Sequence, residues 1–465
     1  MRRMRSLLSL SRRELRSDPW SMLGPGIVVA TTAAFLHPCM TFLSMAIGLQ
    51  GEAWRAAHPD YAVADDVAFA CMVMSFTVVP AIVVLGGLGA GTVGNMAGRI
   101  VQWRLAGASP RQSGGVVIGM LSASALAAGA LGTAASIPLL PATVGMILEA
   151  AGLSGIDVPV DPAAMGATLG AVFLTGALGA VRPAVAASRV LPGPTLREAV
   201  PEPGGHRRTR AALALALAAG AVSTGSSAFA AKPGAAIDSA FNAILGSGVL
   251  AVGAVAAGAP WVFPRVNALL GRAVPATASP AWFAACRQSS AYPKRTTRAA
   301  LPFFAGAGVA GLFTGMIGTW QRAIDASGQA ERLNTVDTVI CLTPPVAIGL
   351  VGTACQMLLS RRQRIADFAS LRVAGASRRT VLGAAVGEAA LTSATVFLLS
   401  TGFTLLVSTM TARALSATGL PAEGSLVWPP LAAVVASGFA AAAAVNVSAA
   451  LRANRGNPRG LLARE

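Results

Sequence analysis

Two short basic phrases hold the residue types in this chain that are best suited to specific ionic contacts. They read WRLAGASPRQ at 103–112 and LRVAGASRRT at 371–380, 268 positions apart. In each phrase one arginine stands three residues before a glycine, and another stands four residues after it. Guanidinium groups make directional hydrogen bonds to carboxylates. The phrases therefore predict two equivalent contact sites for a partner, unless they are ordinary basic loops that only fix membrane topology.

The chain lacks the motifs through which proteins usually hydrolyse ATP or cleave bonds. A phosphate-binding GxxxxGK[ST] loop needs a lysine before Ser or Thr, whereas Lys232 precedes Pro and Lys294 precedes Arg. The sequence holds no HExxH motif, no nucleophile elbow and no pair of carboxylates within an apolar stretch. The three histidines are far apart, and the five cysteines form no CxxC pair. We therefore expect neither an enzyme nor a directly bound cofactor or metal, and we interpret the cysteines as apolar packing residues.

The composition indicates a membrane protein. Of the 465 residues, 54% are hydrophobic and 12% are charged, and the mean hydropathy is +0.63. Soluble domains carry about a quarter charged residues. The net charge of +17 is compatible with nucleic-acid binding, but its distribution along the chain favours a membrane and no nucleic acid. Only two of the 36 basic residues are lysines, a bias typical of a GC-rich bacterial genome.

Apolar stretches predict an all-α polytopic membrane protein with ten transmembrane helices, each of which needs about 20 residues to cross a bilayer. The basic N-terminus leads into an apolar run that is too long for a signal peptide, so we interpret this run as a retained first span. The Ala- and Gly-rich pair within 210–262 has a re-entrant hairpin as its alternative. The predicted spans are 22–49, 67–92, 113–138, 162–183, 210–231, 237–262, 299–320, 336–359, 380–409 and 427–450.

The basic residues predict how the spans are oriented. With ten spans both termini lie on one side, and 31 of the 36 Lys and Arg residues fall there, while 12 of the 19 acidic residues fall on the other side. Positively charged loops stay in the cytoplasm. Both termini and both phrases are therefore expected to be cytoplasmic, in a plasma membrane. The outer loops are too short for a substrate-binding domain, although one has room for a short amphipathic helix at 142–152.

Similar segments flank the two halves of the chain and predict an internal duplication. A basic segment with a proline precedes the first and the seventh span (8–20 and 283–302), and an Arg-Glu pair follows the fourth and the tenth (within 186–199 and 450–465). Such parallel repeats pack about an axis along the membrane normal. The predicted parts are a first four-helix repeat at 1–200, two linking helices at 201–265 and a second four-helix repeat at 266–465.

Glu388 is the exception in spans that are almost free of charge. It lies about two turns into the ninth predicted span. Acids within membrane segments often mark functional sites, so one interpretation is a specific coupling or packing role. The other interpretation is an acid near the interface that reaches water or the pair Arg378 and Arg379.

The segment RIADFASLRVAGASRRTVLGAAVGEAAL at 364–391 resembles the signature of the FtsX-like permeases. These are membrane subunits of type VII ABC systems, which include macrolide-exporter and bacitracin-resistance groups. In that family an acid opens the phrase, an arginine precedes a Gly-Ala-Ser turn, basic residues follow, and a glutamate appears in the next helix. The first phrase departs from this pattern, because Arg99 replaces the acid, Pro110 follows the serine and Met120 stands where the glutamate is expected. The ten-span layout is similar to the bacitracin-resistance group without its large outer domain.

The resemblance implies that a separate cytoplasmic ABC ATPase docks on the two loops, in two copies per chain, and that ATP and Mg²⁺ bind to this partner. It implies export or extraction of a hydrophobic or amphipathic substrate such as a peptide, an antibiotic or a lipid. The alternatives are an ATPase-driven mechanotransmitter that signals to a sensor kinase or a cell-wall hydrolase, and a stand-alone carrier or scaffold. The predicted docking residues are Arg99, Arg104, Gly107, Ala108, Ser109, Arg111, Asp367, Arg372, Gly375, Ala376, Ser377, Arg378 and Arg379, with Glu388 as a candidate coupling acid.

Overall fold

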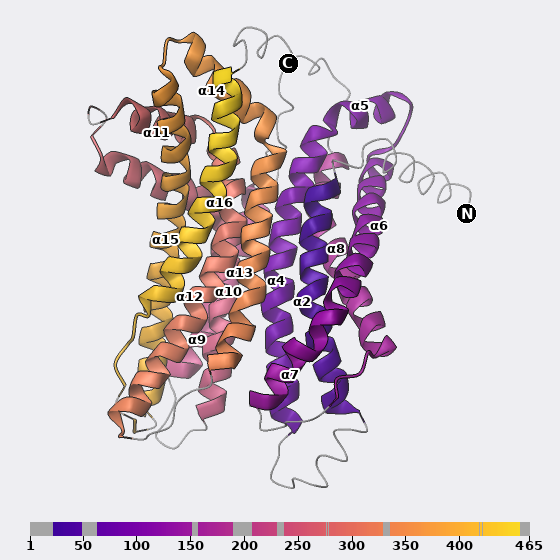
Figure 1. Cartoon of the computed structure of the whole chain (residues 1–465), viewed down its shortest axis with the longest axis vertical. Helices are drawn as coiled ribbons and strands as arrows, with labels where there is room; N and C mark the ends of the chain where they lie inside the picture. The colour runs from indigo at the N-terminus through magenta and orange to yellow at the C-terminus, as the bar shows by residue number, and fades with distance from the viewer. Residues whose placement is uncertain are drawn as a thin grey trace. The chain divides into compact units, whose positions relative to one another are not determined.

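The computed structural model is helical throughout the part of the chain that it describes (Figure 1). The described residues are 22–48, 63–150, 157–188, 207–229, 237–275, 277, 279–328, 335–417, 419–420 and 422–455. The helices are α2 (Leu23–Ile47), α4 (Val63–Asn95), α5 (Ala97–Leu105), α6 (Pro110–Ser136), the 3-10 turn η2 (Ile137–Leu139), α7 (Leu140–Ala150), α8 (Pro162–Ser188), α9 (Arg207–Phe229), α10 (Ile237–Ala273), α11 (Pro280–Ala291), α12 (Pro293–Ala326), α13 (Thr335–Leu359), α14 (Arg361–Val373), α15 (Arg378–Ala417) and α16 (Trp428–Arg455).

The chain divides into two compact units with separate cores. Unit 1 comprises Met1–Gly204 and Asn334–Gly352, and unit 2 comprises Gly205–Leu333 and Thr353–Glu465. Helix α13 therefore contributes to both. Near its start Ile340 packs against the unit 1 cluster that contains Phe42. Near its end Met357 joins a unit 2 cluster with Ala389.

Unit 1 is built on α2, α4, α6 and α8, which pack against one another. Small residues let helices in lipid approach closely. At the contact of α6 with α2, a Cβ atom on Gly132 would lie 2.1 Å from the carbonyl oxygen of Ala30. The short helix α7 packs its apolar side on Phe42 and Met45 of α2, which confirms the helix predicted within 142–152.

Unit 2 is built around α12, which packs against α10, α15 and α16. In its most apolar stretch 94% of the residues are buried within the protein, so the other helices shield it from lipid. The shorter helices α11 and α14 lie at one end of the unit (Figure 1), where α11 packs on α15 and α14 packs on α16. The basic segment that precedes the seventh predicted span, 283–302, forms most of α11 and the start of α12.

Nine helices among the described residues are long and apolar enough to cross a membrane, which describes a multi-pass membrane protein. They correspond to nine of the ten predicted spans. The segment predicted as the fifth span, 210–231, also forms a helix, α9, but this helix is not one of the nine. It begins with basic residues and ends in a run of Ser, Thr and Gly, which lowers its apolar character. The ten-span, four-two-four arrangement and the domain boundaries stay predictions.

Several predicted features lie outside the described residues. They are the basic segment 8–20 and the two Arg-Glu pairs, Arg197–Glu198 and Arg464–Glu465.

Candidate functional site

The first basic phrase forms a sharp corner between α5 and α6, here called the first corner (residues 104–111). The helix α5 ends in a Schellman turn. The N–H of Gly107 donates to the carbonyl of Arg104 at 3.0 Å, and the N–H of Ala108 donates to the carbonyl of Trp103 at 2.9 Å. Gly107 has φ of +91°, in the left-handed region that favours glycine. The glycine of the phrase is therefore a helix stop.

The second basic phrase forms the same corner between α14 and α15, here called the second corner (residues 372–379). The N–H of Gly375 donates to the carbonyl of Arg372 at 3.1 Å, and the N–H of Ala376 donates to the carbonyl of Leu371 at 3.0 Å. Gly375 also has φ of +91°. The two phrases thus specify the same backbone turn by the same hydrogen bonds.

The serine of each phrase starts the next helix. Ser109 forms a capping box with Gln112: its Oγ accepts from the Gln112 N–H at 3.3 Å, and its own N–H donates to Gln112 Oε1 at 2.8 Å. In the second corner the Oγ of Ser377 accepts from the N–H of Thr380 at 3.1 Å. In each AGAS phrase the glycine thus ends one helix and the serine two residues later begins the next. This explains why the same residues occur at both corners.

Each corner presents an apolar residue beside arginines. Leu105 is 69% exposed and Val373, at the matching position, is 55% exposed. Arg111 in the first corner and Arg378 and Arg379 in the second corner are also exposed. An exposed apolar residue next to guanidinium groups suits a protein surface that carries carboxylates around an apolar patch.

The arginine that precedes each glycine acts differently in the two corners. In the second corner Arg372 Nη1 donates to the carbonyl of Ala376 at 2.7 Å and so braces the turn. In the first corner Arg104 Nη1 is buried without a hydrogen-bond partner. Pro110 occupies the first position of α6, where Arg378 opens α15. The backbone turns match, but the side chains around them do not.

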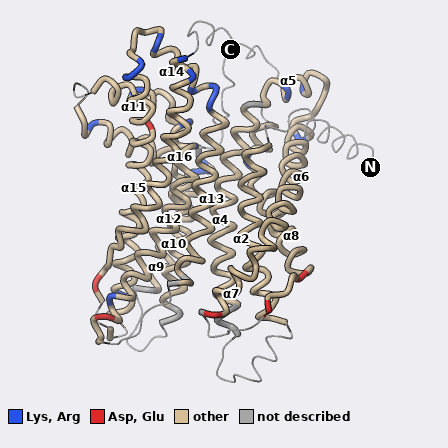
Figure 2. Tube along the Cα trace, in the orientation of Figure 1, with Lys and Arg blue, Asp and Glu red and all other residues tan. Residues whose placement is uncertain are grey.

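Charge is distributed with the same polarity in each unit taken by itself (Figure 2). In unit 1 most Lys and Arg residues lie at the end that bears α5, and Asp and Glu lie at the end that bears α7. In unit 2 most Lys and Arg residues lie at the end that bears α11 and α14, and acids also occur at the opposite end. Each corner is therefore at the basic end of its unit.

Beneath the second corner lies a buried network of charged side chains. Arg364 in α14 is 1% exposed and Glu388 in α15 is 2% exposed. Arg364 Nη1 donates to Glu388 Oε1 at 2.7 Å and to Asn446 Oδ1 of α16 at 2.8 Å. The amide of Asn446 donates in turn to the carbonyl of Ala385 at 3.3 Å. One guanidinium group thus ties the short helix α14 to two long helices.

A second arginine connects α12 to this network. Arg295 pairs through Nη1 with the carboxylate of Asp367 in α14, and its Nη2 lies 3.7 Å from Glu388 Oε1. The four ionised groups are Arg295, Arg364, Asp367 and Glu388, so their formal charges balance. Glu388 Oε2 and Arg295 Nε are buried without a hydrogen-bond partner.

The interpretation of Glu388 as an acid that reaches water or the pair Arg378 and Arg379 is wrong. Those arginines open α15 and lie nine and ten residues before Glu388, a separation of about 14–15 Å along a helix. The short helix α14 instead brings Arg364 to the carboxylate, which is buried. Asp367 likewise faces Arg295 inside unit 2, so this predicted docking residue belongs to the internal network.

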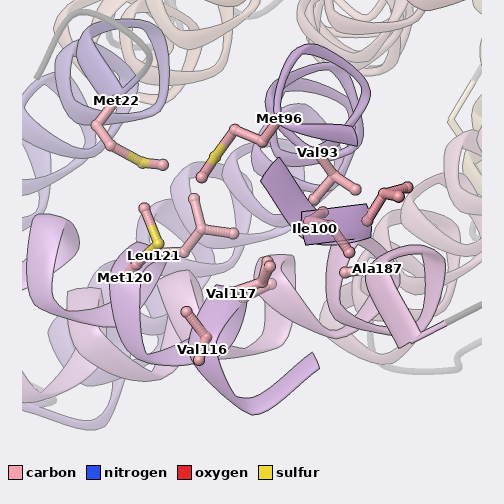
Figure 3. Packing of buried hydrophobic residues seen from close by; sticks show 11 residues of the cluster. Met22, Val93, Met96, Ile100, Val116, Val117, Met120, Leu121 and Ala187 are labelled. Atoms are coloured by element: carbon pink, nitrogen blue, oxygen red, sulfur yellow. The ribbon is translucent and has the colours of Figure 1, made fainter. Parts of the chain in front are cut away.

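Below the first corner lies an apolar cluster (Figure 3). The residues 268 positions before Arg364 and Glu388 are Met96 and Met120, which are 2% and 1% exposed. Figure 3 shows their side chains converging with that of Met22, from the start of α2, in one packed cluster. The departure at Met120 noted in the sequence thus has a counterpart at Met96, and both members of the buried ion pair Arg364 and Glu388 are methionines in the first half.

Arg295 and Arg364 were not among the residues predicted from the sequence. Both occur in clusters of basic residues, in KRTTR and RRQR, where a single buried arginine has no distinguishing mark. The signal that could have found Arg364 is its spacing. It stands 24 residues before the lone acid Glu388, and the matching pair in the first half is Met with Met.

The described residues contain no group of three His, Cys, Asp or Glu side chains placed to hold a metal ion. No match to a curated protein was found. Residues 340–458, which include the second corner and the partners Arg364, Glu388 and Asn446, match the FtsX-like permease C-terminal family.

Proposed function

We propose that this chain is the membrane permease subunit of an ABC transporter, powered by a separate cytoplasmic ATPase that docks on the two corners. The match of residues 340–458 to the FtsX-like permease C-terminal family carries this proposal, because permeases of that family generally pair with ABC ATPases. The corners support it. Each presents an exposed apolar residue, Leu105 or Val373, beside exposed arginines at a fixed backbone turn.

The charge polarity of each unit supports a cytoplasmic position for the corners. Lys and Arg gather at the corner end of both units (Figure 2), and positively charged loops stay in the cytoplasm. Two similar corners on one chain suit two copies of the ATPase. Closure of the ATPase pair on ATP would move the corners and, with them, the helices of each unit as rigid bodies. ATP and Mg²⁺ bind to the partner in this proposal.

A hydrophobic or amphipathic substrate, such as a peptide, an antibiotic or a lipid, fits the apolar helices best. A cavity lined by Phe241, Trp320, Thr411 and neighbouring apolar residues in unit 2 has a volume of about 20 Å³, room for one water molecule rather than a solute. The apolar spans favour a substrate that approaches from the lipid.

Purification of the tagged full chain from native membranes in mild detergent tests the proposal. We expect a stoichiometric partner that carries a GxxxxGK[ST] loop and hydrolyses ATP, and loss of this partner in the double variant Leu105→Asp and Val373→Asp. The control is Val160→Asp, which changes a residue that is 52% exposed outside both corners. Purification of the wild-type chain without any ATPase would contradict the proposal, as would retention of the partner by the double corner variant.

A further inference from the structure

The two corners share a surface but differ in what holds them to the membrane helices. Beneath the second corner the structure has Arg295, Arg364 and Glu388, and at the positions 268 residues before Arg364 and Glu388 the first half has the buried residues Met96 and Met120. We propose that the charged network makes the second corner a rigid lever on α12, α15 and α16, whereas methionine packing makes the first corner compliant. This inference rests on the proposed function in one respect, because it assigns the two corners unequal shares in transmitting the motion of the ATPase.

The first step is the number of helices that one network joins. Arg364 in α14 bonds Glu388 in α15 at 2.7 Å and Asn446 in α16 at 2.8 Å. Arg295 adds α12 through Asp367 of α14, and it also lies 3.7 Å from Glu388. A displacement of α14 against any of the three long helices therefore has to break or lengthen a bond of the network.

The second step is how sharply the energy of these bonds rises when the helices are displaced. Hydrogen bonds between ionised groups are short and directional, and with Arg364 and Glu388 buried water does not stand in for a lost partner. Methionine has three rotatable bonds and a polarizable sulfur, so it adapts to small shifts of its neighbours. The contacts of Met96 and Met120 therefore tolerate a displacement that the ion pair resists.

The third step is that folding does not require the charges. A buried ion pair is weak support for stability, because desolvation offsets most of the attraction. The first half of the chain fills the matching positions with Met96 and Met120, both buried in a packed cluster. What the charged version adds is a fixed geometry between helices, which is the property that a force-transmitting joint needs.

The experiment replaces the ion pair beneath the second corner by the two methionines found at the matching positions of the first half. Arg364→Met with Glu388→Met reproduces the pair Met96 and Met120 while Arg295 keeps Asp367 as a partner. The matched control, Arg322→Met with Glu423→Met, removes the same two charge types at exposed positions of unit 2. Hydrogen exchange of the backbone amides in α14 is measured on each purified full chain. The rate of ATP hydrolysis is measured on each complex relative to the free ATPase.

We expect the double methionine variant to fold and to retain the ATPase, while exchange within α14 accelerates by about tenfold through easier local opening. Its complex should lose most of the permease-dependent change in ATP hydrolysis, and the control should match the wild type in both readouts. Unchanged exchange together with unchanged coupling in the double variant would overturn the proposal. If that variant does not fold, Glu388→Gln keeps a hydrogen-bond acceptor for Arg364 and should raise exchange to a smaller extent. Unchanged exchange in Glu388→Gln would also contradict the proposal that the charged network makes the second corner rigid.

The two proposals fail separately. Exchange in α14 is read on the full chain without a partner, so it decides the rigidity of the second corner even if no ATPase associates with the wild type. An ATPase that associates with the wild type and with the double methionine variant, and whose ATP hydrolysis responds equally to both, would leave the proposed function intact. It would overturn the proposal that the two corners are unequal.

Discussion

Gly375 shows how one residue type determines a turn that a partner can recognise. Its φ of +91° allows the hydrogen bonds that end α14 and leaves Val373 on the surface. A Cβ atom at this position meets no neighbour, so the cost of Gly375→Ala comes from the backbone alone, about 1–2 kcal/mol for a left-handed conformation. We expect thermal unfolding of the purified variant at a lower temperature.

The control for this variant is Gly402→Ala in the interior of α15, where a Cβ atom also has open space. Alanine there should stabilise the helix by about 1 kcal/mol relative to glycine. Equal effects of the two substitutions would show that the turn at Gly375 carries no backbone strain when alanine is introduced.

Arg364 and Glu388 should show strong coupling in a double-mutant cycle. Arg364→Met leaves the buried carboxylate of Glu388 with Arg295 at 3.7 Å, and loss of one partner of a buried pair costs about 3–5 kcal/mol. Replacement of both by methionine should bring the free energy of unfolding back close to that of the wild type. The measurement is unfolding of the single and double variants in the same detergent. Additive losses would contradict a direct ion pair.

Asp161 at the start of α8 connects two helices of unit 1 and gives a pH dependence. Its carboxylate accepts from Ser44 Oγ of α2 at 2.5 Å and from the N–H of Ala163 at 2.8 Å. The Ser44 hydroxyl, followed by the backbone N–H groups of Ala163 and Ala164, holds the pKa of Asp161 below its usual value. A carboxylate with a lowered pKa stabilises the folded protein. This contribution is present above the unfolded pKa of about 3.9 and is lost as the pH falls through the folded pKa.

We therefore expect Asp161→Asn to unfold at a lower temperature than the wild type near neutral pH. The difference should shrink as the pH falls from about 4 through the lowered pKa of the folded protein, where the wild-type carboxylate becomes protonated. The measurement is the unfolding temperature of both proteins across this range. A constant difference at every pH would mean that the carboxylate charge does not contribute to the contact between Ser44 and Asp161.

The long helices and the corners were predictable from the sequence because their signals are local. Apolar length marks nine spans, and the Gly and Ser of each phrase mark a helix stop and a helix start. The sequence failed where contacts join distant segments. Arg364 meets Glu388 only because α14 folds back on α15 and α16, and no pattern within either segment encodes that encounter. Apolar composition marks nine spans among the described residues, whereas the charge distribution predicts ten, because α9 carries basic residues and a run of Ser, Thr and Gly.

Orientation of the whole chain can be tested by single cysteines in a background in which the five native cysteines are replaced by alanine. Cytoplasmic corners predict that cysteine at Arg111 or Arg379 is protected from a membrane-impermeant thiol reagent added to intact cells. Cysteine at Val160 or Glu423, both exposed, should be labelled under the same conditions. The reverse labelling pattern would place the basic ends outside, against the usual retention of positive loops in the cytoplasm.

Cross-linking from the corners tests the proposed role of the whole molecule most directly. A photoreactive residue in place of Leu105 or Val373, in the full chain within native membranes, should form a covalent adduct with one cytoplasmic protein that carries a GxxxxGK[ST] loop. The same residue in place of Val160 should form none. Adducts with the ATPase from both corners are the expected result. Absence of an ATPase adduct from either corner, with the chain present at its normal level, would contradict docking on the two corners.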